Sequence, residues 1–521
     1  MIMKHILSFL LILLISIIYK SVEENNNKGV FIRSAIPIKN KTWTSYNGAV
    51  HLSPDAIFEP TTLEELIDIV NLARINNKTI RCAGEGHTGS SLSVTKDYLV
   101  VVKKLNKVTV QKHFKHGWTA IAEAGASFGD LENALRNHDP PLTIDSAPIY
   151  DTFRVAGVVA TGSHGARTYT GITSNQLCSM KIVTGSGKVY EFSEEINKLE
   201  FNAAKVNLGL LGIMYSLTFR VQPMYNLRLS DIFVPLNWLD NPLNIKNLLE
   251  SSDSVQLYYW PYNGFDQDED PNLHDFNKDR IVVKNWIRTN DTATYTKQQL
   301  KKIHETQQQK SIKLYEQIYY NFSNTVATSN VAAKILSSNK NTSVVYQTPD
   351  AIHHFVYEEN VSKYDLVAFG FKVDPDFSNV AVEFSYAIKA LYEFAKKGKF
   401  PVNYIAEIRF LKSNEAFLSP TFNHDPKALY CLLDFITVTG TPDYEEFCSF
   451  LSQRLFDKYK AKMHWGKRYE FIPNVTSYLS EVLSDEIKQF EKVRAKYDPD
   501  KIFFDNKSLE DIFNRALNGK K

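Results

Sequence analysis

Two glycines and a histidine follow a short apolar segment in the run Arg-Cys-Ala-Gly-Glu-Gly-His-Thr-Gly-Ser at residues 81–90. Gly84 and Gly86 let the backbone adopt positive φ and approach a ligand closely. The successive N–H groups of such a turn form a concave nest that suits a pyrophosphate. Many purely structural turns share the Gly-x-Gly spacing. Such a turn needs no imidazole, however, so His87 favours a binding or chemical role.

Two later segments have the same character. Residues 157–166 (Gly-Val-Val-Ala-Thr-Gly-Ser-His-Gly-Ala) are small and glycine-rich and carry His164. Residues 201–213 place Gly209 and Gly212 among apolar residues. Short strands are predicted between these segments, so the pattern is typical of backbone that surrounds one extended cofactor.

The order and content of the three segments resemble the flavin-binding half of the vanillyl-alcohol-oxidase superfamily. Within it they look most similar to the sugar-lactone oxidases (gulonolactone and arabinonolactone oxidases) and the alditol oxidases. Glu407-x-Arg409 is similar to the family's Glu-x-Arg strand. Tyr-Tyr-Trp-Pro-Tyr at 258–262 corresponds to an aromatic-Trp-x-Pro stretch of the family. Further matches are Leu-Ser-Pro at 418–420, His-Trp-Gly-Lys at 464–467 and Asp-Pro…Phe-x-Asn at 498–506. Together the matches cover roughly residues 43–516.

The resemblance implies an α+β protein with a PCMH-type FAD-binding domain and a second α+β substrate (cap) domain. It also implies FAD as the cofactor, bound covalently through His87. The implied cofactor-binding residues are Ala83, Gly84, Glu85, Gly86, His87, Thr88, Gly157, Thr161, Gly162, Ser163, His164, Gly165, Gly212 and Ile213. His164 either lines the flavin or satisfies nearby backbone groups. Residues 145–157 contain no cysteine, which argues against the doubly linked oligosaccharide oxidases.

Three charged residues are the implied catalytic group: Glu407, Arg409 and Lys467. Glu407 and Arg409 are two residues apart on a predicted strand, so both side chains point to one face. On a cavity wall Arg409 would stabilise the negative charge of reduced flavin, whereas on a surface the two would form an ordinary ion pair. Lys467 would bind a sugar hydroxyl or act as the base; alternatively it is a solvated lysine near the end of an element.

The resemblance implies oxidation of a sugar-derived hydroxyl, first of all that of an aldono-1,4-lactone, with hydride transfer to flavin N5. Oxygen would reoxidise the flavin and give H2O2. The alternatives are an alditol (polyol) oxidase, a secreted glycoprotein that kept the fold but lost catalysis, and a membrane-anchored electron-transfer subunit. The expected partners are therefore a small sugar lactone or polyol and O2.

The composition sets further limits on partners and location. A formal net charge of +2 over 521 residues, with scattered Lys and Arg, offers no basic stripe for nucleic acid. The apolar run over residues 6–18, between Lys4 and Lys20, is shorter than the ~20 residues that span a bilayer and is typical of a secretory signal. Residues 1–21 are thus a signal peptide or an anchor, and a membrane is involved only if this segment stays attached. Asn-x-Ser/Thr sequons occur at Asn40, Asn77, Asn290, Asn321, Asn341, Asn360, Asn474 and Asn506, of which Asn506 is the least suited to glycosylation.

Hydrophobic periodicity places the elements and the domains. Capping patterns predict helices that start after Thr62 and Ser127. Longer helices are predicted over 297–320, 380–397, 442–459, with Thr441 as the cap, and 482–495. The expected domains are FAD-binding at 43–225, substrate (cap) at 226–475, and a C-terminal segment, 476–521, that returns to the first domain. Cys431 and Cys448 are the one cysteine pair considered for a disulfide.

Overall fold

The computed structural model describes residues 36–265, 269–321, 325–326, 343–353 and 363–519. The predicted targeting segment at 6–18 and the sequons at Asn341 and Asn360 lie outside these residues. None of the helices in the described part of the chain is long and apolar enough to cross a bilayer.

The N-terminal half contains two sheets. A parallel sheet has the strand order β3 (Ala56–Phe58), β5 (Tyr98–Val101), β4 (Ile80–Ala83). An antiparallel sheet has the order β10 (Val189–Ser193), β9 (Leu177–Val183), β11 (Ile213–Arg220), β7 (Gly117–Glu123), β6 (Val108–His113). Helix α2 (Leu63–Ile75) connects β3 to β4, and the Thr62 side chain accepts the Glu65 amide at its start, as predicted. This β-α-β unit leads the chain into the Gly84–His87 turn.

Three further helices belong to this half: α3 (Phe128–Arg136), α4 (Val155–Ala160) and α5 (Lys198–Ala204). The predicted Ser127 cap of α3 is a full capping box with Asp130. Short strands complete the N-terminal half: β1 (Trp43–Thr44), β2 (His51–Leu52), β8 (Leu142–Thr143) and β12 (Gln222–Pro223).

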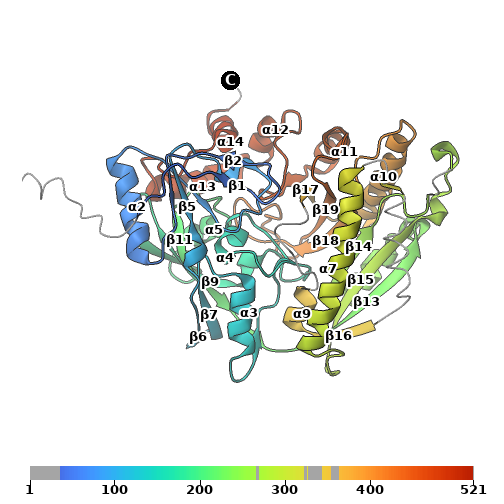
Figure 1. The fold of residues 1–521 in the computed structure, drawn as a ribbon, viewed down its shortest axis with the longest axis horizontal. Coiled ribbons are helices and arrows are strands. Elements are labelled where there is room, and N and C mark those ends of the chain that lie inside the picture. Colours follow the sequence, from blue (N-terminus) through green and yellow to red (C-terminus); the bar gives the residue numbers. More distant parts are fainter. Residues whose placement is uncertain (1–35, 266–268, 322–324, 327–342, 354–362, 520–521) are drawn as a thin grey trace, which may run out of the picture.

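The second half is built on one sheet of eight strands, on the right of Figure 1. Their order is β16 (Ser343–Gln347), β13 (Asn226–Pro235), β15 (Arg280–Thr289), β14 (Ser254–Tyr259), β18 (Ile405–Lys412), β19 (Leu429–Val438), β17 (Tyr364–Lys372), β20 (Lys462–Met463). Its helices are α6 (Leu243–Glu250), α7 (Lys297–Tyr320), α9 (Thr348–Ile352), α10 (Ser378–Ala395) and α11 (Tyr444–Tyr459). Helix and sheet are mixed in both halves, so the predicted α+β class is confirmed.

Side-chain alternation gives the central strands of this sheet two different faces. On β18, Ile408 and Phe410 belong to the main hydrophobic core, whereas Glu407 and Arg409 line a cavity on the opposite face. On β19, Phe435 packs at 5.3 Å against Phe447 of α11. The helices on the apolar face thus leave the polar face free to form a site.

The C-terminal helices are α12 (Val475–Val482), α13 (Ser484–Tyr497) and α14 (Lys507–Asn518), and they lie beside the N-terminal half in Figure 1. The Ile80 amide donates to the Ile502 carbonyl at 2.8 Å, and the Gly185 amide donates to Tyr497 at 3.0 Å. Asn506 is buried, and its side-chain amide donates to the Ser91 carbonyl at 2.7 Å. This amide therefore makes a structural contact and is not accessible for glycosylation.

Three sequence-based expectations differ from the structure. Helix α11 starts at Tyr444, not at Pro442, because Asp443 adopts φ 62° and the Thr441 hydroxyl donates to the Val438 carbonyl at 2.6 Å instead of capping the helix. The helix predicted at 482–495 is α13, which begins only at Ser484, because Leu483 (φ −110°, ψ 14°) separates it from α12. All four cysteines are free, so the disulfide considered for Cys431 and Cys448 is not formed.

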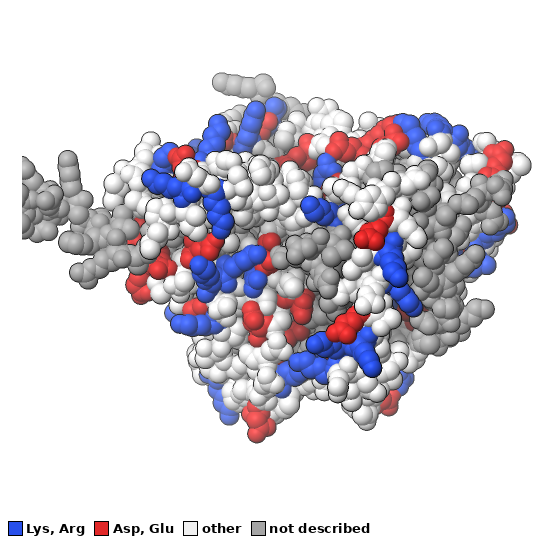
Figure 2. Space-filling view, viewed as in Figure 1, with Lys and Arg blue, Asp and Glu red and all other residues white. Residues whose placement is uncertain are grey.

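Charged side chains of both signs are interspersed over the face of the molecule in Figure 2. This distribution reflects the near balance of 60 basic and 58 acidic residues. The charged residues predicted to be catalytic, Glu407, Arg409 and Lys467, instead line a buried cavity.

Candidate active site

A narrow cavity of about 90 Å³ runs beside the first glycine turn. Its walls come from β4 and the turn after it, from α4, and from the segment before β11. The predicted cofactor residues that line it are Ala83, Gly84, Gly86, Thr88, Gly157, Thr161, Gly212 and Ile213. Tertiary folding therefore brings all three glycine-rich segments of the sequence to one cavity.

Glycine is required at some positions of this cavity wall because a larger residue would be strained or would clash there. Gly86 has φ +84° and Gly212 φ +136°, conformations that side chains with a Cβ rarely adopt. A Cβ on Gly212 would also lie 2.2 Å from the Val183 carbonyl oxygen. A Cβ on Gly157, by contrast, would meet no atom within 4 Å, because it would point into open space. This wall therefore leaves room for a ligand, as a dinucleotide cofactor such as FAD requires.

Three predicted cofactor residues support the turns and line neither this cavity nor the one that follows. Glu85 forms ion pairs of 2.6 Å with both Lys103 and Arg154. Gly162 has φ +67°. A Cβ on Gly165 would lie 2.3 Å from the Ala147 carbonyl, so close backbone packing explains that glycine.

A second cavity, of about 150 Å³, lies on the other side of the Gly86–Thr88 turn. The remaining predicted site residues all line it: His87, Ser163, His164, Glu407, Arg409 and Lys467. Three come from the N-terminal half and three from the second half, so the cavity lies where the two halves meet.

His87 is held among aromatic rings. Its imidazole stacks on Tyr46, with ring centroids 4.3 Å apart, and packs against Phe153 at 4.5 Å. Burial lowers the pKa of His87 to about 3, and Glu85 opposes this shift only in part. The ring is therefore neutral at physiological pH, the form in which an imidazole nitrogen can bond to carbon.

Glu407 and Arg409 form a tight ion pair on the polar face of the sheet. Arg409 donates to both Glu407 carboxylate oxygens, and the Nη2 to Oε2 distance is 3.1 Å. Gln256, on the neighbouring strand β14, donates to Glu407 Oε1 at 3.1 Å. Burial alone would lower the pKa of Arg409, but Glu407 raises it above its ordinary value, so the guanidinium stays charged.

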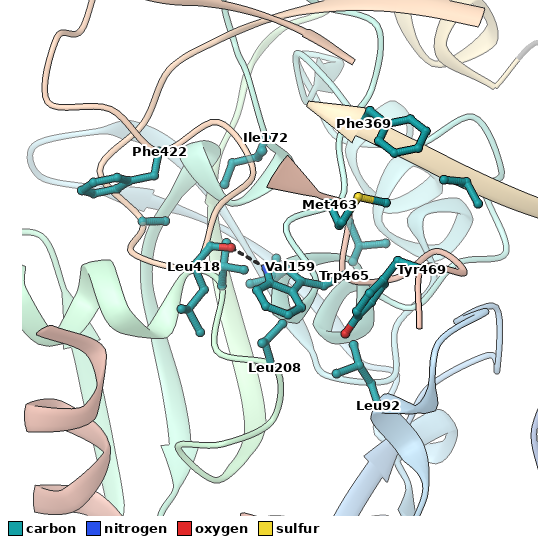
Figure 3. Packing of buried hydrophobic residues seen from close by; sticks show 14 of the residues in the cluster. Leu92, Val159, Ile172, Leu208, Phe369, Leu418, Phe422, Met463, Trp465 and Tyr469 are labelled. Atoms are coloured by element: carbon teal, nitrogen blue, oxygen red, sulfur yellow. Dashed lines mark hydrogen bonds between the residues drawn. The ribbon is translucent and has the colours of Figure 1, made fainter. Parts of the chain in front are cut away.

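Lys467 is positioned by a rigid loop. The Trp465 indole donates to the Leu418 carbonyl at 2.6 Å, and Figure 3 shows this ring among buried side chains that include Val159 and Leu208. The Gly466 amide donates to His464 Nδ1 at 3.0 Å. Burial lowers the pKa of Lys467, while Asp434 and Glu407 oppose the shift.

His164 makes the backbone contact that was one of its two predicted roles, while its contact with the flavin stays a prediction. It lines the cavity, and its Nδ1 lies 3.0 Å from the Gly165 carbonyl. Burial and Arg409 lower the pKa of His164 to about 3, so it too is neutral.

Several residues in or beside the two cavities were not predicted from the sequence. Asp434 interrupts the apolar run Leu-Leu-Asp-Phe-Ile at 432–436. A charged residue within a buried strand is the sequence signal from which a role for Asp434 could have been predicted. Arg81 is buried beside the narrow cavity and donates to the carbonyls of Leu92, Leu208 and Phe503, which joins three distant segments. Tyr46 and Tyr150 line the charged cavity, but no sequence pattern distinguishes them.

Comparison with protein families finds two matches. Residues 54–193 match the model of the FAD binding domain. Residues 217–511, more than half of the 521-residue chain, match the model of D-arabinono-1,4-lactone oxidase. The first model covers the glycine-rich segments at 81–90 and 157–166, and the second covers Glu407, Arg409 and Lys467.

Individual relatives agree with these models. D-arabinono-1,4-lactone oxidase of Debaryomyces hansenii is 30% identical over 237 residues, 43% of this chain and 41% of that protein. The chain thus aligns with only about two fifths of this relative. L-gulonolactone oxidase of Mus musculus is 23% identical over 484 residues, 91% of this chain and 98% of that protein.

A solved structure of similar fold is cholesterol oxidase from B. sterolicum, with a TM-score of 0.75 and 16% identity over 92% of this chain and 97% of that one. The glycine-lined cavity and the FAD-binding match together identify FAD as the cofactor. This chain belongs to the D-arabinono-1,4-lactone oxidase family.

Proposed function

We propose that this protein oxidises a ring hydroxyl of an aldono-1,4-lactone and passes the electrons to oxygen. The CH–OH group becomes C=O, and the two electrons and two protons removed end on O2 as H2O2. The observation that carries this proposal is the convergence of Glu407, Arg409 and Lys467 with His87 on one buried cavity in a chain of this family.

Different parts of the chain have different roles in the proposed reaction. The narrow glycine-lined cavity and its neighbouring turn hold FAD, and FAD supplies the acceptor for the hydride. Arg409 places a fixed positive charge at the reaction centre, while Glu407 orients that guanidinium and a substrate hydroxyl. The aromatic rings around His87 exclude water.

We also propose that His87 bonds covalently to the flavin. Forming this nitrogen–carbon bond removes one hydrogen from the imidazole and one from a flavin carbon, and O2 takes up both as H2O2. The neutral state of His87 supports this assignment, because a protonated ring has no free nitrogen lone pair.

A substrate panel tests the overall proposal. The purified holoprotein should consume oxygen and release H2O2 with aldono-1,4-lactones, and enzyme reduced anaerobically by substrate should reoxidise within seconds of mixing with air. Turnover of open-chain alditols alone would make it a polyol oxidase. An absence of turnover with both classes, in protein that carries flavin, would contradict the proposal.

Lys467 is the proposed base that accepts the hydroxyl proton, and this role predicts a pH dependence. Only the neutral amine accepts a proton, so kcat/KM should rise with pH as Lys467 deprotonates. Because burial lowers the pKa of Lys467, the rise should occur below the ordinary lysine range near 10.5. Lys467→Met should remove this rise and slow turnover by about 10² or more.

Lys462→Met is the matched control. Lys462 is also buried with a lowered pKa, but it pairs with Glu486 at 3.1 Å and does not line the cavity. It should keep the wild-type pH profile. If Lys467→Met is slow but retains the rise, Lys467 binds the substrate and another group is the base.

A further inference from the structure

The catalytic cavity contains a second buried carboxylate that the roles above do not use. Asp434 on β19 lies directly opposite Glu407 on β18, and both side chains line the cavity. Their exposed fractions are 5% and 2%. Like charges directly opposite each other on a sheet are destabilising, so the surroundings must compensate for this pair.

The two carboxylates differ in their partners. Glu407 accepts hydrogen bonds from Arg409 and Gln256. Asp434 Oδ1 is buried and accepts no hydrogen bond from any described residue. A buried polar atom in this state costs free energy unless a ligand or water satisfies it. Oδ1 lies in a cavity wall, where a bound molecule can reach it.

The balance of charge in the cavity depends on Asp434. Glu407 and Asp434 supply two negative charges, Arg409 supplies a positive one, and Lys467 supplies a second positive charge only while its amine is protonated. Without Asp434 the cavity would lose one of its two negative charges, and in a setting of low dielectric this loss makes the binding of an anion more favourable. The open-chain aldonate that forms when a lactone hydrolyses is such an anion.

We propose that Asp434 is a specificity-determining residue, which accepts a hydrogen bond from a hydroxyl of the neutral substrate and excludes carboxylate-bearing ligands by its charge. This inference rests on the proposed function, because it assumes a polyhydroxylated substrate in this cavity. Discrimination of this kind combines an attractive contact with a repulsive one.

Burial and Glu407 raise the pKa of Asp434 to about 7, while Lys467 and Arg409 oppose the shift. The test is therefore made at pH 8.5, where Asp434 is ionised. D-glucitol and D-gluconate are suitable probes, because they differ only in having a hydroxyl or a carboxylate group at C1. Calorimetry under anaerobic conditions gives the Kd of each for the FAD-bound protein, whether or not either compound is turned over.

Wild-type protein should bind glucitol at least about tenfold more tightly than gluconate. Asp434→Asn keeps an oxygen acceptor but removes the charge. The variant should therefore bind gluconate more tightly than wild type by a factor of about ten or more, while its Kd for glucitol changes by less than about threefold. Asp434→Leu removes the acceptor and should weaken glucitol binding by about tenfold.

Asp279→Asn is the matched control. Asp279 is also buried, but it accepts hydrogen bonds from Tyr259 and Tyr392 and does not line this cavity. It should leave both dissociation constants unchanged. An unchanged gluconate affinity in Asp434→Asn would overturn the inference, as would undetectable binding of both probes to wild type. Failure of lactone turnover alone would count against the proposed function and would leave this comparison intact.

Discussion

Replacing His87 with alanine should leave a protein whose flavin dissociates completely on denaturation. Wild-type protein precipitated with acid should retain flavin fluorescence in the pellet, because the imidazole–flavin bond survives unfolding. In His87→Ala the only ring nitrogens at the turn are gone, so the pellet should be colourless and the supernatant should contain FAD.

His51→Ala is the control, since His51 is exposed and its Nδ1 lies 2.8 Å from the Thr44 hydroxyl. It should retain covalent flavin. Flavin that washes out entirely from denatured wild-type protein would refute the covalent bond. Flavin that stays bound to denatured His87→Ala would assign the bond to another residue.

The second large effect is expected at Arg409. Arg409→Met should slow the anaerobic bleaching of flavin absorbance by substrate by about 10² or more, because one aimed cationic donor in a dry site contributes a few kcal/mol. Stopped-flow absorbance measures this rate directly. Arg409→Lys should recover part of it, since lysine restores the charge but not the two-point contact with Glu407.

Arg454→Met provides the comparison for Arg409. Arg454 makes the same kind of two-point pair with Glu383, between α11 and α10 and outside the cavity. It should leave the bleaching rate unchanged even if it lowers the melting temperature. An unchanged rate in folded, flavin-loaded Arg409→Met would place Arg409 outside the reaction centre.

Local sequence signals were sufficient for much of the fold. The Thr62 and Ser127 caps start α2 and α3 where the sequence predicts, since capping side chains bond to amides only three residues away. Helix α7 has the predicted bounds. Where tertiary contacts compete with local preference, prediction failed: Thr441 turns to the Val438 carbonyl, and α11 begins later than its proline suggests.

The sequence by itself determined the residue types and the order of the site. The glycine turn with His87, the Glu407-x-Arg409 strand and the Trp465-Gly466-Lys467 loop are each recognisable because their spacing along the chain is short. Most residues predicted from these motifs line one of the two cavities.

Only the tertiary structure decided which distant residues meet. Strand register sets Asp434 opposite Glu407, and the Trp465–Leu418 hydrogen bond connects two motifs that are 47 residues apart. Arg81 likewise satisfies carbonyls that lie 127 and 422 residues away. Such contacts depend on the packing of whole elements, which no local pattern encodes. For that reason the charge balance of the cavity, and with it the role inferred for Asp434, could be found only in the folded chain.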